Sequence, residues 1–172
     1  MNLQTIKQIY TLKGLERTGW VKNKIQQPET VASHSFGVGF LAYLYAKQCG
    51  VDEHKVMKMG LLHDVQESIV GDITPFCGVS DENKHDLEMK AAEIFAAQQP
   101  EMKELFDEYE ANTTQEAKFV HDCDKLDMLI QAWIYEQQQG VKLDQFFEHC
   151  DLPKSFDVLI QVRKEIERSR AK

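Results

Sequence analysis

The sequence lacks several features that would indicate particular protein classes. Its four cysteines form no Cys-x-x-Cys pair, which excludes a zinc ribbon and a thioredoxin-like motif. The apolar run at residues 40–46 is too short for a transmembrane helix, which needs about 20 consecutive apolar residues. Residues 1–7 contain no apolar signal-peptide core. We therefore expect a cytoplasmic protein with reduced thiols and no membrane segment.

Basic residues are also scarce, with 20 Lys and Arg against 28 Asp and Glu and a net charge of −8. This excess of acid argues against a nucleic acid polymer as partner, because such binding needs a basic surface. A small phosphorylated substrate stays possible, since one local cationic pocket is enough for it. A length of 172 residues with 42% hydrophobic content is sufficient for one folded domain over residues 1–172.

Strand signals are weak, because the sequence has no Asn-Gly turn and little alternation of apolar and polar residues. Apolar residues recur instead at helical spacing. The sequence thus predicts an all-α, single-domain helical bundle with a motif-bearing core at about 10–135 and C-terminal helices at about 141–170. The predicted helices cover about 2–13, 30–48, 53–68, 82–98, 101–110, 114–139 and 154–170, with loops at 18–29 and 70–80.

Capping residues and glycines refine this prediction. Asp52 is placed to cap the helix at 53–68, and Thr113 with Glu116 has the spacing of a capping box before the helix at 114–139. Gly140 marks the end of that helix. Gly37, together with Gly39, predicts that the helix at 30–48 closely approaches the helix that contains His63.

Two histidines and two carboxylates lie on three separate apolar-patterned segments: His34, the doublet His63-Asp64, and Asp124. Asp124 has apolar neighbours one helical turn away on both sides, so its carboxylate points where a core residue is expected. A buried carboxylate is costly unless it is paired or binds a metal. These four residues are therefore the predicted metal ligands.

Two acidic residues are candidates for supporting roles. The sequence neighbours of Asp127 do not show whether its side chain faces the core. We predict that Asp127 supports a metal ligand and does not bind the metal itself. Glu67 follows His63 by four residues, so on a continuous helix both would share a face and Glu67 would reach a water molecule held by the metal. The other histidines have charged or loop surroundings and are interpreted as surface residues: His54, His85, His121 and His149.

Two imidazoles and two carboxylates suit one divalent ion, and Mn²⁺, Co²⁺, Mg²⁺, Fe²⁺ and Zn²⁺ are all compatible with this set. Four protein ligands leave room for water or substrate only if the ion is five- or six-coordinate. With Glu67 beside the ion, the site predicts hydrolysis by metal-activated water rather than a closed structural zinc site.

This residue pattern resembles the HD-domain metal-dependent phosphohydrolases, an all-α superfamily defined by a histidine, a later His-Asp doublet and a distant aspartate. Longer stretches are similar to its 5′-deoxynucleotidase branch. One departure is Ser33, where the family usually has glutamate before the first histidine. The similar stretches are residues 15–20 (Leu-Glu-Arg-Thr-Gly-Trp), 28–36 (Pro-Glu-Thr-Val-Ala-Ser-His-Ser-Phe) and 63–75 (His-Asp-Val-Gln-Glu-Ser-Ile-Val-Gly-Asp-Ile-Thr-Pro).

The resemblance implies removal of the 5′-phosphate from deoxyribonucleoside monophosphates by a homodimer. It also implies that Glu67 activates the attacking water, Arg17 binds the phosphate, Asp72 assists the leaving 5′-oxygen, and Trp20 lines the sugar or base side. Simpler structural interpretations stay open: an ion pair for Arg17, a capping carboxylate for Asp72 and a core aromatic for Trp20.

Two other functions compete with this one. The first is an HD phosphohydrolase that acts on another small nucleotide, such as a triphosphate or a cyclic nucleotide. The second is a non-catalytic all-α binding module in which the metal is structural. Glu67 and Asp72 favour an enzyme, because a structural site does not need them.

Overall fold

A computed structural model describes residues 1–74, 77–148, 150 and 156–171. Regular structure in these residues is helical, apart from an isolated antiparallel β-bridge between Glu16 and Thr30, so the predicted all-α class is confirmed. The elements are α1 (Leu3–Tyr10), the 3₁₀ turn η1 (Thr11–Lys13), α2 (Thr18–Lys22), α3 (Val31–Cys49), α4 (Glu53–Leu62), α5 (Glu67–Val70), α6 (Asp81–Ala96), α7 (Pro100–Ala111), α8 (Gln115–Gln139), α9 (Asp144–Glu148) and α10 (Asp157–Arg170).

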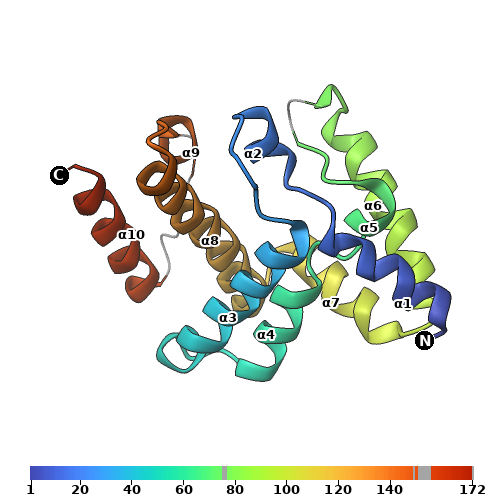
Figure 1. Cartoon of the computed structure of the whole chain (residues 1–172). Helices are drawn as coiled ribbons and strands as arrows, with labels where there is room; N and C mark the ends of the chain where they lie inside the picture. The colour runs from blue at the N-terminus through green and yellow to red at the C-terminus, as the bar shows by residue number, and fades with distance from the viewer. Residues whose placement is uncertain (75–76, 149, 151–155, 172) are drawn as a thin grey trace.

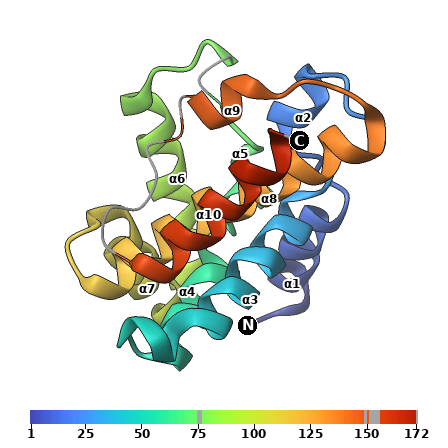
Figure 2. The same ribbon diagram turned by 90° about the vertical axis from the view of Figure 1, so that its left-hand side faces the viewer.

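Helices α3, α4 and α8 form the centre of the bundle (Figure 1). Helix α4 packs along α3, and α8 contacts both of them. Helices α6 and α7 pair on one side of Figure 1, where α1 contacts α5, and α10 lies on the other side. Figure 2 shows α10 in front of α8, against which it packs. The two termini consequently lie at opposite ends of the bundle as Figure 1 shows it.

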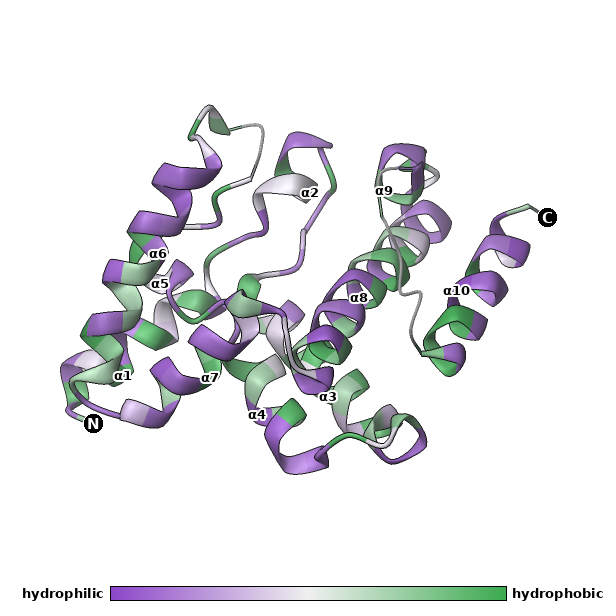
Figure 3. Ribbon diagram, turned by 180° about the vertical axis from the view of Figure 1, so that it is seen from behind, coloured by the Kyte–Doolittle hydropathy of each residue, from purple (hydrophilic) through white to green (hydrophobic). Residues whose placement is uncertain are grey.

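The core fills the space between these helices and is apolar. Val38 of α3, Val56 of α4 and both Leu126 and Leu129 of α8 have no exposed surface. Figure 3 shows hydrophobic and hydrophilic stripes alternating around the helices, as expected where one face of each helix is buried. Within the residues that the structure describes, no helix combines the length and apolarity needed to cross a bilayer.

Capping explains where several helices begin and end. The Asp52 carboxylate accepts the backbone N–H groups of residues 54 and 55, which confirms the predicted cap of α4. Gly140 adopts the left-handed conformation at φ 64° and ends α8 as predicted. The predicted cap at the start of α8 was wrong by one residue. Thr114, not Thr113, is extended and accepts the Ala117 N–H, because the helix begins one position later.

The prediction of one helix over 53–68 was also wrong. Helix α4 ends at Leu62, and tight i→i−3 hydrogen bonds follow, such as Glu67 N–H to the Asp64 carbonyl at 3.1 Å. The Gln66 side chain donates to the His63 carbonyl at 2.6 Å and so occupies an oxygen that a continuing helix would use. A short helix, α5, then starts at Glu67.

Two short helices, α2 and α9, were not predicted, and α2 lies in the expected loop at 18–29. The backbone N–H of Thr18, at the start of α2, donates to the Asp72 carboxylate, and the Thr18 hydroxyl donates to the Asp72 carbonyl at 2.8 Å. This cap comes from a residue 54 positions away. Residues 75–76 and 151–155, which include Pro75 and the predicted start of the last helix, lie outside the described residues.

The glycines of α3 permit two different close contacts. A methyl group at Gly39 would lie 2.9 Å from Leu61 Cγ, which confirms the predicted approach of α3 to α4. The prediction that Gly37 also permits the approach of α3 to α4 was wrong. It faces α8 instead, where a methyl group would overlap the carboxylate of Asp127.

Candidate metal centre

The segment before α3 brings two functional residues together. Backbone hydrogen bonds join Arg17 N–H to the Glu29 carbonyl at 3.0 Å and Val31 N–H to the Leu15 carbonyl at 2.8 Å, on either side of the β-bridge. Thr30 caps α3 through its side chain. This short pairing fixes Arg17 beside the first turn of α3, and that turn carries His34.

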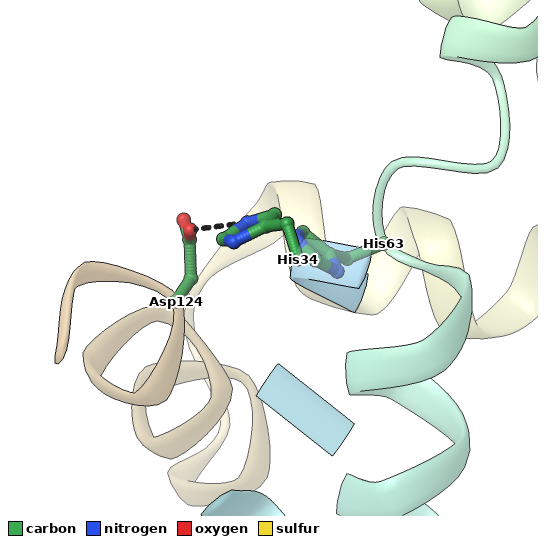
Figure 4. Close-up of side chains that lie close together, drawn as sticks. All are labelled: His34, His63 and Asp124. Carbon is green, nitrogen blue, oxygen red and sulfur yellow. Dashed lines mark ion pairs between the residues drawn. The ribbon is translucent and has the colours of Figure 1, made fainter. Parts of the chain in front are cut away.

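Three of the predicted ligands converge between α3, α8 and the turn after α4 (Figure 4). One side-chain atom from each of His34, His63 and Asp124 lies within 4.8 Å of the others. His34 Nε2 is 3.0 Å from Asp124 Oδ1, and the two imidazole rings meet edge to face with centroids 5.3 Å apart. Three distant segments of the chain therefore meet at one point.

Asp64, the fourth predicted ligand, borders the same point. Its Oδ2 lies 3.3 Å from His63 Nε2 and 3.8 Å from His34 Nε2. The same oxygen is 3.3 Å from Arg17 Nη1. Asp64 thus links the imidazole pair to the guanidinium group.

Hydrogen bonds on the far side of each ring select the tautomer that a metal requires. His34 Nδ1 lies 2.8 Å from Asp127 Oδ2, and His63 Nδ1 lies 2.8 Å from the Gly60 carbonyl. Each Nδ1 therefore carries a proton that it donates, and each Nε2 is left facing the centre, where a metal ion could bind it in place of a proton. Asp127 lies behind His34, as its sequence position suggested.

Both Nε2 atoms are buried and have no hydrogen-bond partner. The 3.0 Å contact between His34 and Asp124 is close enough for an ion pair but lacks the angle of a hydrogen bond. Two buried ring nitrogens without hydrogen-bond partners are costly unless something else binds them. Two imidazoles with Asp64 and Asp124 form a donor set that fits one divalent ion.

The electrostatics also favour positive charge at this point. Burial lowers the pKa of His34, but its interactions with Asp124 and Asp127 outweigh this effect and raise the pKa to about 10. Burial would raise the pKa of Asp124, yet its interaction with His34 holds that pKa well below its usual range. The carboxylates therefore stay ionised and attract either protons on the imidazoles or a cation in their place.

Glu67 lines a cavity of about 350 Å³ that His63, Asp64 and Asp124 also line. Its side chain is only 4% exposed, and Oε2 is buried without a hydrogen-bond partner. Burial raises the pKa of Glu67, and the negative charges of Asp64 and Asp72 raise it further. The expectation that His63 and Glu67 share a face of one helix was wrong, because they flank the turn after α4, but both line this cavity.

Arg17, just before α2, and Asp72, just after α5, also line the cavity. Burial lowers the pKa of Arg17, but Asp64 and further carboxylates raise it above its ordinary value, so the guanidinium stays charged. Asp72 lines the cavity and also caps α2. Its capping role is therefore compatible with a role in the site.

Trp20 is 1% exposed and packs in the core against Tyr135 and Phe146. Its indole N–H donates to Glu29 Oε1 at 2.8 Å. The ring also forms part of the wall of a second cavity of about 180 Å³, and Arg17 lines both cavities. The core position is clear from this packing, while the contact with substrate stays a prediction.

Several cavity residues were missed at the sequence level. His121, interpreted as a surface residue, lines the cavity and stacks on Tyr109 with ring centroids 3.8 Å apart. The Tyr109 hydroxyl donates to Asp124 Oδ2 at 3.2 Å. His54 and His85 are exposed as predicted, and His149 lies outside the described residues. These contacts join α7 to α8, and no local pattern in the sequence signals them.

The close approach of Gly37 to Asp127 leads to a testable prediction. Gly37→Ala is expected to lower metal affinity about 10- to 100-fold, because displacing Asp127 releases the Nδ1 of His34. Calorimetric titration with Mn²⁺ measures this change. Gly14→Ala is the control, since a methyl group there would lie an ordinary 3.8 Å from its nearest neighbour. Unchanged affinity in Gly37→Ala would show that Asp127 does not orient the ligand.

Together these features define a helical protein with a candidate metal centre of imidazoles and carboxylates. Residues 9–155 match the family described as HD domain. The chain belongs to the HD domain family.

Two relatives named for an enzymatic activity and one solved structure agree with this assignment. The chain is 40% identical over 136 residues to the 5′-deoxynucleotidase hdd1 of Schizosaccharomyces pombe, covering 74% of this chain and 68% of the relative. It is 34% identical over 177 residues to the 5′-deoxynucleotidase HDDC2 of Danio rerio, covering 99% and 88%. A conserved hypothetical protein from Pyrococcus furiosus superimposes with a TM-score of 0.81 at 34% identity, covering 97% and 99%.

Proposed function

We propose that this protein is a metal-dependent phosphohydrolase that removes the 5′-phosphate from deoxyribonucleoside monophosphates. The observation that carries the proposal is the pair of buried, unpartnered Nε2 atoms of His34 and His63, which meet Asp124 beside the cavity that Glu67 and Arg17 line. The similarity to two 5′-deoxynucleotidases supports the substrate class.

His34, His63, Asp64 and Asp124 would hold one divalent ion. Such an ion supplies Lewis-acid activation of water and neutralises phosphate charge. Mn²⁺, Co²⁺, Mg²⁺, Fe²⁺ and Zn²⁺ all accept mixed nitrogen and oxygen ligands, so the donor set favours a divalent ion without selecting one of them.

Glu67 accepts a proton from the water that attacks phosphorus. Its position suits this role, because a general base must lie within reach of the proton that it accepts, and Glu67 lines the same cavity as His63, Asp64 and Asp124. The unpartnered Oε2 is available to receive the proton. A purely structural metal site would not require a buried carboxylate without a hydrogen-bond partner beside it.

Arg17 binds the phosphate oxygens through its guanidinium group and stabilises the charge that develops during displacement. Asp72 holds the start of α2 and thereby the position of Arg17, and its carboxylate assists the departing 5′-oxygen. Trp20 lines the side of the sugar or base through the second cavity, which shares Arg17 as a lining residue with the first.

A phosphate-release assay tests this function. Purified protein is incubated with deoxyribonucleoside and ribonucleoside monophosphates, and also with triphosphates and cyclic nucleotides, in Mn²⁺, Co²⁺, Mg²⁺ or chelator. We expect metal-dependent release from the deoxyribonucleoside monophosphates and loss of activity in chelator. Release confined to triphosphates or cyclic nucleotides would favour the alternative substrates, and bound metal without any release would favour a non-catalytic binding module.

We also propose that the protein is a cytoplasmic homodimer. The thiols of Cys49, Cys77 and Cys123 form no disulfide, which suits a reducing compartment. The outer face of α3 exposes four large apolar residues at helical spacing, here called the α3 face: Phe36, Phe40, Tyr43 and Leu44.

A second copy of the chain is the partner that this face fits. The Phe36 and Phe40 rings stack with centroids 6.2 Å apart, which gives a flat apolar patch. Roughly 400 Å² of side-chain surface is available, since large side chains bury about 150–250 Å² each and these are about half exposed. That area suits the centre of a two-fold interface, which buries about 800 Å² on each partner.

Phe40→Glu is therefore expected to convert a dimer to a monomer, because each subunit would bring a charge into the apolar centre of the interface. Analytical ultracentrifugation measures the change. Ile94→Glu is the control, since Ile94 is an exposed apolar residue on α6. A wild-type chain that sediments as a monomer, or a Phe40→Glu variant that still dimerises, would contradict this use of the α3 face.

A further inference from the structure

A second cation lines the cavity, and the resemblance to known enzymes gave no role to it. Lys84 lies in the first turn of α6, which Ser80 caps through its side chain. The Lys84 side chain is 38% exposed, compared with 17% for Arg17. The two cations reach the cavity from separate elements, Lys84 from α6 and Arg17 from the start of α2.

Glu88 holds this lysine from one turn further along α6. Lys84 Nζ lies 3.6 Å from Glu88 Oε1, which is longer than a normal hydrogen bond. The ammonium group can therefore turn toward an anion in the cavity without breaking a short contact. Burial raises the pKa of Glu88, and the charge of Lys84 acts in the opposite direction.

The placement of this pair departs from the usual amphipathic pattern of a surface helix. Glu88 is buried, whereas the apolar side chains of Leu87 and Ile94 on the same helix are exposed. Burying a carboxylate costs desolvation free energy that an exposed carboxylate does not lose. A helix that buries this carboxylate while its leucine is exposed is expected where the carboxylate serves a site.

The negative charge around the cavity explains why a lysine would help to bind a phosphate there. A phosphate dianion that enters meets many negative groups, and Arg17 is already paired with Asp64. Lys84 adds a second positive side chain at the wall. The carboxylates that line this cavity are Asp64, Glu67, Asp72, Glu88, Glu110 and Asp124.

We propose that Lys84 binds the phosphate group of the substrate together with Arg17, and that Glu88 positions the lysine at the cavity wall. This inference rests on the proposed phosphohydrolase function and adds a phosphate-binding residue to it. In the free protein Lys84 pairs with Glu88, and in the complex its N–H donors turn to phosphate oxygens.

Competitive inhibition separates a phosphate contact from a contact with the rest of the nucleotide. Lys84→Met keeps the aliphatic stem and removes the charge. We expect the inhibition constant of inorganic phosphate to rise about 10- to 100-fold, the range for losing a hydrogen bond between charged groups. The inhibition constant of a deoxynucleoside without phosphate should stay unchanged. Lys84→Arg should restore most of the phosphate affinity, and Lys90→Met, an exposed lysine on α6, should change neither constant.

Other outcomes overturn the inference. A rise only for the deoxynucleoside would place Lys84 against the sugar or base, and no rise for either inhibitor would remove it from the site. Thermal unfolding of each variant confirms that it is folded. If the wild-type protein releases no phosphate, the proposed function fails. Calorimetry with inorganic phosphate on metal-loaded wild type and Lys84→Met then tests the lysine separately.

Discussion

Glu67→Gln is expected to lower kcat about a hundredfold or more while the protein keeps its metal. Glutamine has nearly the shape of glutamate but cannot accept the proton of the attacking water, and loss of a general base typically costs 10²- to 10⁴-fold, roughly, in rate. Glu67 is buried, and no neighbouring residue hydrogen-bonds its Oε2. Steady-state kinetics and metal analysis of the same sample measure both quantities.

Glu104→Gln is the matched control, because Glu104 is exposed on α7 and lies away from the cavity lining. Its kinetics should equal those of the wild type. A Glu67→Gln variant with full activity would remove Glu67 from the mechanism. A variant that loses metal along with activity would instead assign Glu67 to metal binding.

His63→Ala is expected to release the metal, abolish turnover and lower thermal stability together. The His63 side chain is buried and supplies one of two unpartnered nitrogen atoms, so its loss removes a ligand and leaves a polar gap. Metal binding stabilises a folded protein, by about 2.7 kcal/mol when free metal is a hundredfold above its dissociation constant. Wild type should therefore gain thermal stability on addition of Mn²⁺, and His63→Ala should gain little.

His54→Ala provides the control for this variant, since His54 is an exposed histidine on α4. Metal content is measured by elemental analysis after dialysis, and unfolding by calorimetry. Stoichiometric metal in His63→Ala would contradict the ligand set that the geometry supports.

The sequence predicted the features that depend on local periodicity. Asp52 and Gly140 mark helix ends because caps act within a few residues of the backbone groups they serve. Asp124 was found because its neighbours one turn away on α8 predict a buried face, and the structure confirms that this face meets His34. Patterns of this kind can be recognised in a sequence without knowledge of the rest of the fold.

Features that depend on tertiary contacts could not be predicted from such local patterns. Helix α2 is capped by Asp72, which lies 54 residues away, so its segment looked like a loop. His121 has a charged sequence neighbourhood, yet it stacks on Tyr109 of another helix. Lys84 and Glu88 look like an ordinary surface pair at four-residue spacing until the packing of α6 turns them toward the cavity. In each case the partner is distant in the chain.

The early end of α4 has a consequence for how adjacent ligands work. Consecutive side chains diverge by about 100° around an α-helix, so on an unbroken helix His63 and Asp64 would face different directions. At the end of α4 the two side chains nevertheless meet, with Asp64 Oδ2 3.3 Å from His63 Nε2. Because α4 ends at Leu62, the turn that follows it sets where both ligands point. A substitution that lengthened α4 would therefore move the two ligands without altering either of them.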